Sequence, residues 1–394
     1  MNERLVVPLS ALGARDLAVA GGKGANLGEL IRAGFPVPDG FVITTHAYAV
    51  AARAAGVDPR DPVGARERLK AEEMPAEIAS AIRVAYRAQG GRVAVRSSAT
   101  AEDLPEASFA GQQDTLLDIE GEDALLDAVR RCWASLWNER AVAYRATLEV
   151  DERALRLAVV VQRMVRATIA GVLFTADPIT GRRRRAAIDA VRGLGEQLVS
   201  GAVNPDHYLV DVRTGAVLER RGDILDDARL SELADIGARI ETHFGKPQDM
   251  EWAIDDAKLW IVQSRDITTL YPVPASAPDP ERDLRVYLSA NVAQGVLQPL
   301  TPMGIQTFRL LGAAFAGAVG RPVTDPAAGP SVIADAGLRL WVDLSGVLRN
   351  RAAREIPVRV LSIMEARSSG IFARLLDDPR LAPGGGSRVR SVVS

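Results

Sequence analysis

The segment that decides the fold of this chain is Val95-Arg96-Ser97-Ser98-Ala99-Thr100-Ala101-Glu102-Asp103-Leu104-Pro105, continuing to Ser108-Phe109-Ala110-Gly111-Gln112-Gln113-Asp114. The valine-rich residues 92–95 predict a strand, which delivers Arg96 into a loop of small hydroxyl residues. A guanidinium beside hydroxyl and backbone N–H groups suits phosphate oxygens, because it stays charged and its fork matches their geometry. Taken alone, the segment fits an ordinary Ser/Thr turn equally well.

A second segment, Gly21-Gly22-Lys23-Gly24, precedes an amphipathic run that contains Leu27, Leu30 and Ile31. We expect it to open a helix, where glycines let the backbone approach an anion and the helix N-terminus adds partial positive charge. Lys23 would add a mobile cation. The pattern is not the Walker motif, because glycine and not Ser or Thr follows Lys23. A simple tight turn is the plainer explanation of this tetrapeptide.

Far downstream, two apolar runs around a short polar turn predict a β-hairpin over residues 248–265. Asp249 and Glu251 are two residues apart in its first strand, so both carboxylates point to one face. Gln263 and Arg265 share a face of the second strand for the same reason. Oxygen ligands on one face suit Mg²⁺, which takes one or two protein carboxylates and completes its shell with phosphate and water. A solvated acidic strand face is the alternative.

Together, and in this order, the three segments resemble the nucleotide-binding domain of the phosphoenolpyruvate synthase and pyruvate phosphate dikinase family, which includes the rifampicin phosphotransferases. The resemblance covers residues 5–270 and extends to five further motifs: Gly34-Phe35-Pro36-Val37-Pro38-Asp39-Gly40-Phe41, Gly171-Val172-Leu173-Phe174-Thr175-Ala176-Asp177-Pro178, Gly193-Leu194-Gly195-Glu196, Val199-Ser200-Gly201 and Asn204-Pro205-Asp206. It implies a mixed α+β fold of the ATP-grasp type, in which two lobes hold ATP between them.

The resemblance also implies roles for individual residues. Three basic residues would neutralise the polyphosphate and serve as the catalytic residues: Lys23, Arg96 and Arg265. Three residues with side-chain oxygens would hold Mg²⁺: Asp249, Glu251 and Gln263. Contacts to the nucleoside would come from a strand and from the Gly193–Glu196 motif: Gln162, Met164 and Glu196. The implied cofactors are therefore ATP and Mg²⁺.

Composition limits the classes of partner. The formal net charge of −2 gives no electrostatic reason to expect nucleic acid or an anionic membrane as a partner. No apolar run approaches the roughly 20 residues that a membrane span needs, and the N-terminus has no signal-peptide pattern. Cys132 is the single cysteine, which excludes an internal disulfide. A reducing cytoplasm is the expected location.

Strands and helices interleave along the chain, which predicts a mixed α+β class. Residues 157–161 and, apart from Asp189, residues 188–191 are apolar, so we expect them to form central strands. The expected organisation, in chain order, is a nucleotide-binding domain over residues 1–270, a proline-rich linker over 271–283, an incomplete substrate or central domain over 284–382 and a disordered tail over 383–394.

The resemblance implies that Mg-ATP is cleaved and that a phosphoryl group passes to a histidine carrier and then to an acceptor. Pyruvate would be the acceptor in a phosphoenolpyruvate synthase-like enzyme, and a rifamycin in an antibiotic-modifying one. The three histidines, His46, His207 and His243, all lie outside the family's phosphohistidine motif. We therefore expect the chain to need a separate carrier domain or subunit. A non-catalytic ATP-binding module is the alternative from another functional class.

Overall fold

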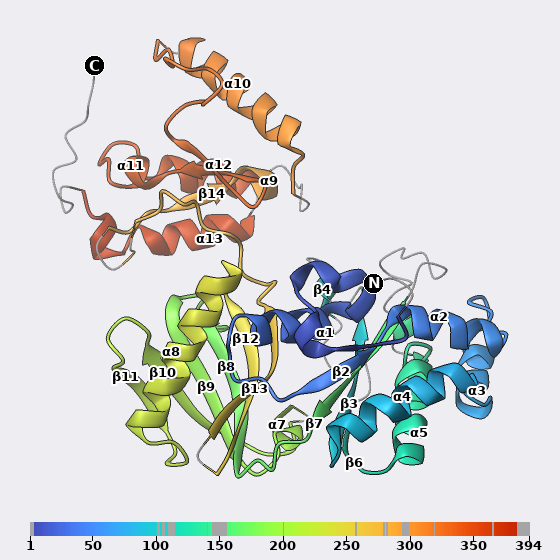
Figure 1. Cartoon of the computed structure of the whole chain (residues 1–394). Helices are drawn as coiled ribbons and strands as arrows, with labels where there is room; N and C mark the ends of the chain where they lie inside the picture. The colour runs from blue at the N-terminus through green and yellow to red at the C-terminus, as the bar shows by residue number, and fades with distance from the viewer. Residues whose placement is uncertain are drawn as a thin grey trace. The chain divides into compact units, whose positions relative to one another are not determined.

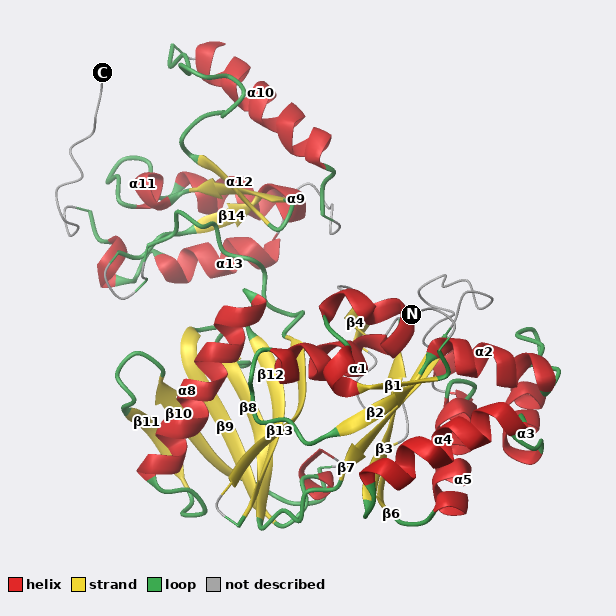
Figure 2. Cartoon of the chain, viewed as in Figure 1, coloured by secondary structure: helices red, strands yellow, loops and turns green. Residues whose placement is uncertain are grey.

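The computed structural model describes residues 4–100, 103–104, 107–108, 115–139, 141–143, 156–199, 201–256, 258–278, 280, 283–293, 299–318, 320–364 and 366–383. The chain divides into two compact units, Met1–Leu270 and Tyr271–Ser394 (Figure 1). Both units combine helices with antiparallel sheets, so the predicted mixed α+β class is confirmed (Figure 2).

The first lobe of the first unit is a five-stranded antiparallel sheet. Its strands, in spatial order, are β1 (Val6–Pro8), β2 (Gly40–Ile43), β7 (Leu157–Arg163), β3 (Val93–Ala99) and β6 (Thr115–Ile119). The apolar strand β7 lies at the centre of this sheet, as predicted. Four helices contribute to the core on one face: α2 (Thr45–Ala54), α3 (Pro62–Ala71), α4 (Ala76–Gln89) and α5 (Glu122–Ser135). The buried Cys132 and Trp133 of α5 belong to this core.

The second lobe is a six-stranded antiparallel sheet. Its strands, in spatial order, are β11 (Val217–Arg221), β10 (Asp206–Asp211), β9 (Arg183–Arg192), β8 (Ile169–Ala176), β12 (Gln248–Asp255) and β13 (Lys258–Asp266). Helix α8 (Asp227–Phe244) covers one face (Figure 1), where Leu230 and Leu233 share a core with Ile188 and Met250. The short helix α7 (Glu196–Val199) follows β9. On each strand, the residues that alternate with these core residues point to the opposite face of the sheet.

Helix α1 (Leu17–Arg32) joins the two lobes, because its apolar side packs in the same core as residues of both sheets. It follows two single 3₁₀ turns, Leu9–Ala11 and Ala14–Asp16. The helix is interrupted at Gly21, whose φ of 66° and ψ of 176° are not helical. The glycine segment was predicted to open a helix, and the residues after Gly21 do so: two helices meet at this kink, and the second one carries Leu27, Leu30 and Ile31.

The second unit has its own small sheet and core. The sheet order is β14 (Tyr287–Ser289), β16 (Arg339–Asp343) and β15 (Ile333–Ala336). Five helices and a 3₁₀ turn accompany it: α9 (Ala290–Ala293), α10 (Pro302–Ala318), α11 (Ser345–Leu348), α12 (Ile356–Met364), α13 (Ala366–Leu375) and Pro379–Leu381. Leu348, Leu361 and Phe372 are among its buried residues. The roles assigned to the linker, the second unit and the tail from sequence stay predictions.

One local prediction needs correction. Strand β3 does not end at Arg96, because Ser97 and Ser98 continue it and are buried at 2% and 0% exposure. Beyond Thr100, the hydroxyl loop is described only as the two-stranded ribbon β4 (Asp103–Leu104) and β5 (Ala107–Ser108), and its other residues lie outside the described part. Among the described residues, no helix is long and apolar enough to cross a membrane.

Candidate functional site

Arg96 connects the two lobes of the first unit. It lies on β3 and is only 7% exposed, although it carries a charge. Its Nη2 donates to Glu251 Oε2 at 2.5 Å and to Gln263 Oε1 at 2.8 Å, and its Nη1 donates to the Val262 carbonyl at 2.7 Å. All three acceptors belong to the β12–β13 hairpin of the other sheet. A buried guanidinium requires this kind of pairing, since an isolated buried charge is strongly unfavourable.

The hairpin register sets the positions of the polar side chains. Asp249 is directly opposite Arg265, and Glu251 is directly opposite Gln263. Directly opposite residues point to the same face, so the four side chains predicted from sequence do share one face. The register shifts after Glu251, which leaves Val262 as the extra residue of a β-bulge. Its carbonyl is the one that accepts from Arg96.

Asp249 and Arg265 form a second ion pair on this face. Asp249 Oδ2 accepts from Arg265 Nε at 2.9 Å and lies 2.7 Å from Nη2. Burial raises the pKa of Asp249 above its ordinary value, and the neighbouring Glu251 adds to this, while Arg265 opposes it. Each carboxylate on this face is therefore paired with an arginine, Asp249 with Arg265 and Glu251 with Arg96. An added cation would favour the ionised form of Asp249.

The chemistry of the site fits Mg-ATP. Arg96 Nε is buried and has no hydrogen-bond partner among the described residues, so this guanidinium can still donate to one more acceptor. A phosphate oxygen is an acceptor of suitable charge and geometry. The oxygens of Asp249, Glu251 and Gln263 are the hard ligands that Mg²⁺ takes from proteins.

The glycine segment packs against the end of β3. A Cβ on Gly21 would lie 2.0 Å from the Ser98 carbonyl oxygen, so no other residue fits there. Ser98 Oγ donates to the Ala20 carbonyl at 2.8 Å and accepts from Gly24 N at 3.2 Å. Close helix–strand packing thus explains the kinked Gly21. Lys23 lies half-buried in the same turn, beside this contact with β3.

The three residues predicted to contact the nucleoside lie around the connection between the lobes. Gln162 is 2% exposed and lies on the same face of its sheet as Arg96, and its Nε2 donates to the Pro38 carbonyl at 3.3 Å. Met164 is half-buried, and Glu196 is exposed at the start of α7. In the described part of the chain, no hydrogen bond joins Met164 or Glu196 to the Arg96 cluster.

An apolar cluster adjoins the polar one. Val165, Ala170 and Ala253 are buried together, and Trp260 and Val262 pack against them. Ala253 is two residues from Glu251 on β12, and Ala170 is its partner on β8. A Cβ built on Gly195 lies 3.5 Å from Ala170, so the turn after β9 reaches the same surface. The face thus carries an apolar region beside its charged region.

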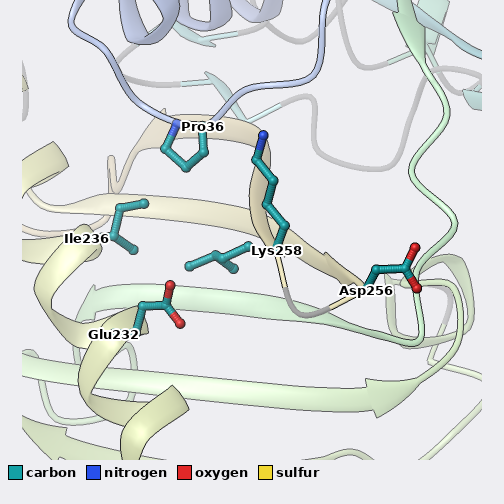
Figure 3. A pocket seen from close by; sticks show the side chains of 6 residues that line it. Pro36, Glu232, Ile236, Asp256 and Lys258 are labelled. Atoms are coloured by element: carbon teal, nitrogen blue, oxygen red, sulfur yellow. The ribbon is translucent and has the colours of Figure 1, made fainter.

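A separate surface hollow of about 480 Å³ lies at the other end of the hairpin. Figure 3 shows it between the Pro36 loop, Glu232 and Ile236 of α8, and the hairpin turn at Asp256 and Lys258. Lys258 is five residues from Gln263, or roughly 16 Å along a strand. None of the residues predicted from sequence to bind nucleotide lines this hollow, so we do not assign it to the site.

Sequence reasoning missed two contacts that help to build the site. The Val262 carbonyl that accepts from Arg96 belongs to the extra residue of a β-bulge, and the alternation of residue types along a strand does not predict where a bulge occurs. Asn26 Nδ2 of α1 donates to the Ser264 carbonyl at 3.1 Å and ties the glycine helix to the hairpin. The polar Asn26 within the apolar helix pattern was the one available signal.

A family model and several curated proteins match this chain. The family model "Pyruvate phosphate dikinase, AMP/ATP-binding domain" matches residues 17–224 and 219–283, which is more than half of the chain. A protein named rifampicin phosphotransferase from a Streptomyces species is 45% identical over 361 residues, covering 79% of this chain and 41% of that protein. A second protein of that name, from Bacillus subtilis, is 37% identical over 401 residues, covering 89% of this chain and 44% of that protein.

A protein named probable phosphoenolpyruvate synthase, from Methanothermobacter thermautotrophicus, is 43% identical over 310 residues, covering 66% of this chain and 45% of that protein. The chain therefore spans less than half the length of the curated relatives that it matches. Solved structures match weakly: a D-alanyl-alanine synthetase A from Vibrio cholerae gives a TM-score of 0.30 at 11% identity, covering 64% of this chain and 59% of that one.

Proposed function

Because this chain belongs to the family of the pyruvate phosphate dikinase AMP/ATP-binding domain, we propose that it performs the ATP half-reaction of a rifampicin phosphotransferase-like enzyme. In this proposal it binds Mg-ATP between its lobes and cleaves it to AMP. One of the two phosphoryl groups would pass to a histidine carrier and then to a rifamycin-like acceptor, and the other would pass to water and leave as inorganic phosphate. The observation that carries the proposal is Arg96, a buried guanidinium that Glu251 and Gln263 hold and whose Nε has no hydrogen-bond partner in the described part of the chain.

Phosphoryl transfer depends mainly on positioning and on charge neutralisation. Bound Mg-ATP would supply the phosphoryl group and the metal that neutralises part of its charge. Arg96, Arg265 and Lys23 would hold the phosphate oxygens. Asp249, Glu251 and Gln263 would hold the metal. Glu251 and Gln263 would have to release Arg96 as they take the metal, and Arg96 would then turn its fork to the phosphates.

The nucleoside would lie toward the connection between the lobes. Gln162 shares the sheet face of Arg96 and supports a role in orienting the base, together with the backbone at Met164. The apolar cluster of Val165, Ala170 and Ala253 supports stacking of a flat, apolar ring system. Glu196, which is exposed, would reach the nucleoside only from the rim of the cleft.

The rifamycin acceptor is favoured over pyruvate by the extent of the similarity. Relatives named rifampicin phosphotransferase match 79% and 89% of this chain, whereas the Methanothermobacter phosphoenolpyruvate synthase matches 66%. The longer matches reach into the second unit. Phosphoenolpyruvate synthesis stays the second candidate, because that relative is 43% identical over the region that it shares.

A transfer experiment tests the proposal. The chain would be incubated with isotope-labelled Mg-ATP and a separately produced phosphohistidine domain from a relative of each class, and then with rifampicin or pyruvate. We expect label on the carrier and then on rifampicin, and neither when Glu251 is changed to alanine. If label passes to pyruvate and not to rifampicin, the chain belongs to a phosphoenolpyruvate synthase and the rifamycin proposal is wrong. An unlabelled carrier in the presence of bound ATP would refute the phosphotransferase function.

A further inference from the structure

On one face of the six-stranded sheet, a row of directly paired residues runs from Glu251 to two further polar residues, Asp189 and His207. Glu251 is paired with Val172 on β8, Val172 with Asp189 on β9, and Asp189 with His207 on β10. Directly paired residues of antiparallel strands point to the same face. Asp189 and His207 therefore share the face of the proposed metal ligands, opposite the face that α8 covers.

Asp189 and His207 form a defined pair in this row. His207 Nδ1 lies 2.6 Å from Asp189 Oδ1, and their side chains are 30% and 27% exposed. The pair is thus half-buried but still reachable. Among the described residues, His207 is the one recorded hydrogen-bond partner of the Asp189 carboxylate, which leaves Oδ2 able to accept from a ligand.

The distances on this face match the parts of a nucleotide. Asp189 is two strand spacings from Glu251, or about 10 Å. The apolar residue Ala170 lies two positions along β8 from Val172, which places it about 8 Å from both carboxylates. Glu251, Ala170 and Asp189 thus form a triangle with one metal-binding, one apolar and one hydrogen-bonding corner. An extended nucleoside triphosphate has its phosphates, base and ribose hydroxyls at comparable separations.

We propose that Asp189 binds the ribose hydroxyls of the nucleotide and makes the site selective for ribonucleotides over 2′-deoxyribonucleotides. This inference rests on the proposed function, because it needs the phosphates at Glu251. An ionised carboxylate accepts hydrogen bonds from vicinal hydroxyls, as acidic residues do for ribose in other nucleotide sites. The shared hydrogen bond with His207 fixes the orientation of the carboxylate. His207 is therefore a positioning residue that does not touch the nucleotide.

Calorimetric titration of Mg-ATP and of Mg-2′-deoxy-ATP into the chain tests the inference. The readout is the ratio of the two dissociation constants, which partial loss of folded protein does not change. We expect the wild-type chain to bind ATP about tenfold to a hundredfold more tightly than 2′-deoxy-ATP, which is the fold-change for a hydrogen bond to a charged group. Asp189→Ala should bring the ratio to within about twofold of one.

Two variants of His207 separate positioning from a merely structural role. His207→Asn retains a side-chain N–H near the place of Nδ1 and should keep most of the selectivity. His207→Phe retains the ring volume without the donor and should lose most of it. Asp235→Asn, on the exposed side of α8, is the matched control and should leave the ratio unchanged.

The outcomes distinguish this inference from the function on which it rests. A wild-type chain that binds neither nucleotide refutes both. If both proteins bind both nucleotides, and the ratio of the two dissociation constants is the same in the wild-type chain and in Asp189→Ala, only the ribose assignment is refuted. Loss of selectivity in Glu196→Gln but not in Asp189→Ala also overturns it, since the ribose would then lie at α7.

Discussion

Replacing Arg96 by lysine keeps the positive charge but removes the planar fork. The arginine makes three hydrogen bonds to the opposite lobe, with Glu251 at 2.5 Å, Val262 at 2.7 Å and Gln263 at 2.8 Å. A lysine ammonium on a flexible stem would retain about one of them. The change therefore tests whether the fork geometry, and not the charge alone, holds this site.

The expected size of the effect follows from these contacts. Two lost hydrogen bonds at a buried charge should lower the free energy of unfolding by about 2–4 kcal/mol. For a unit of this size that corresponds to a Tm lower by about 4–7 °C. Affinity for Mg-ATP should fall roughly tenfold to a hundredfold, since a bidentate contact to phosphate is also lost.

Arg92→Lys is the matched control, because Arg92 lies on the same segment but its side chain is 57% exposed and pairs with Asp118 and Glu120 at the surface. Exposed pairs of this kind contribute about 0–1 kcal/mol. Thermal denaturation followed by circular dichroism, with and without Mg-ATP, measures both variants. Equal losses at the two positions, or an unchanged Arg96→Lys protein, would refute the role given to Arg96.

Three further predictions concern other parts of the first unit. Gly21→Ala should lower the free energy of unfolding, measured by denaturant unfolding, by about 2–5 kcal/mol. Gly34→Ala is its control and should lower it by only about 1 kcal/mol, because Gly34 has a similar φ but nothing lies within 4 Å of the added Cβ. Burial opposes ionisation of Asp206, but the donors Ile224 N, Tyr208 Oη and Asp223 N outweigh it and hold its pKa below the ordinary value. A lowered carboxyl pKa stabilises the fold above the ordinary value, so Asp206→Asn should lower the Tm at pH 7, and the difference should shrink below about pH 4. Incubated alone with labelled ATP, the chain should form no acid-labile phosphohistidine; robust labelling of any of its three histidines would require a different mechanism.

The local features of the site could be predicted from the sequence. Alternation in the hairpin placed Asp249 and Glu251 on one face, and the register confirms it. A run that is apolar on both faces identified β7 as a central strand. Both features are set by side-chain periodicity within a short segment, so no knowledge of the tertiary fold is needed.

The contacts between distant segments could not be predicted in this way. Arg96 and Glu251 are 155 residues apart, and their pairing depends on how the two sheets meet. The Asp189–His207 pair depends on the register between β9 and β10, which neither strand specifies alone. Ser98 was expected in a loop because of its hydroxyl, but its bonds to α1 keep it buried in a strand.

Calorimetric titration of Mg-ATP into the wild-type chain and into Glu251→Ala tests the central claim most directly. The wild-type chain should show saturable binding in the micromolar to millimolar range that is lost or strongly weakened when Mg²⁺ is chelated. Glu251→Ala should show the same weakening even with Mg²⁺ present, because it removes a proposed metal ligand. Absence of binding by the wild-type chain, or a Glu251→Ala variant that binds Mg-ATP as tightly as the wild-type chain does, would contradict the account.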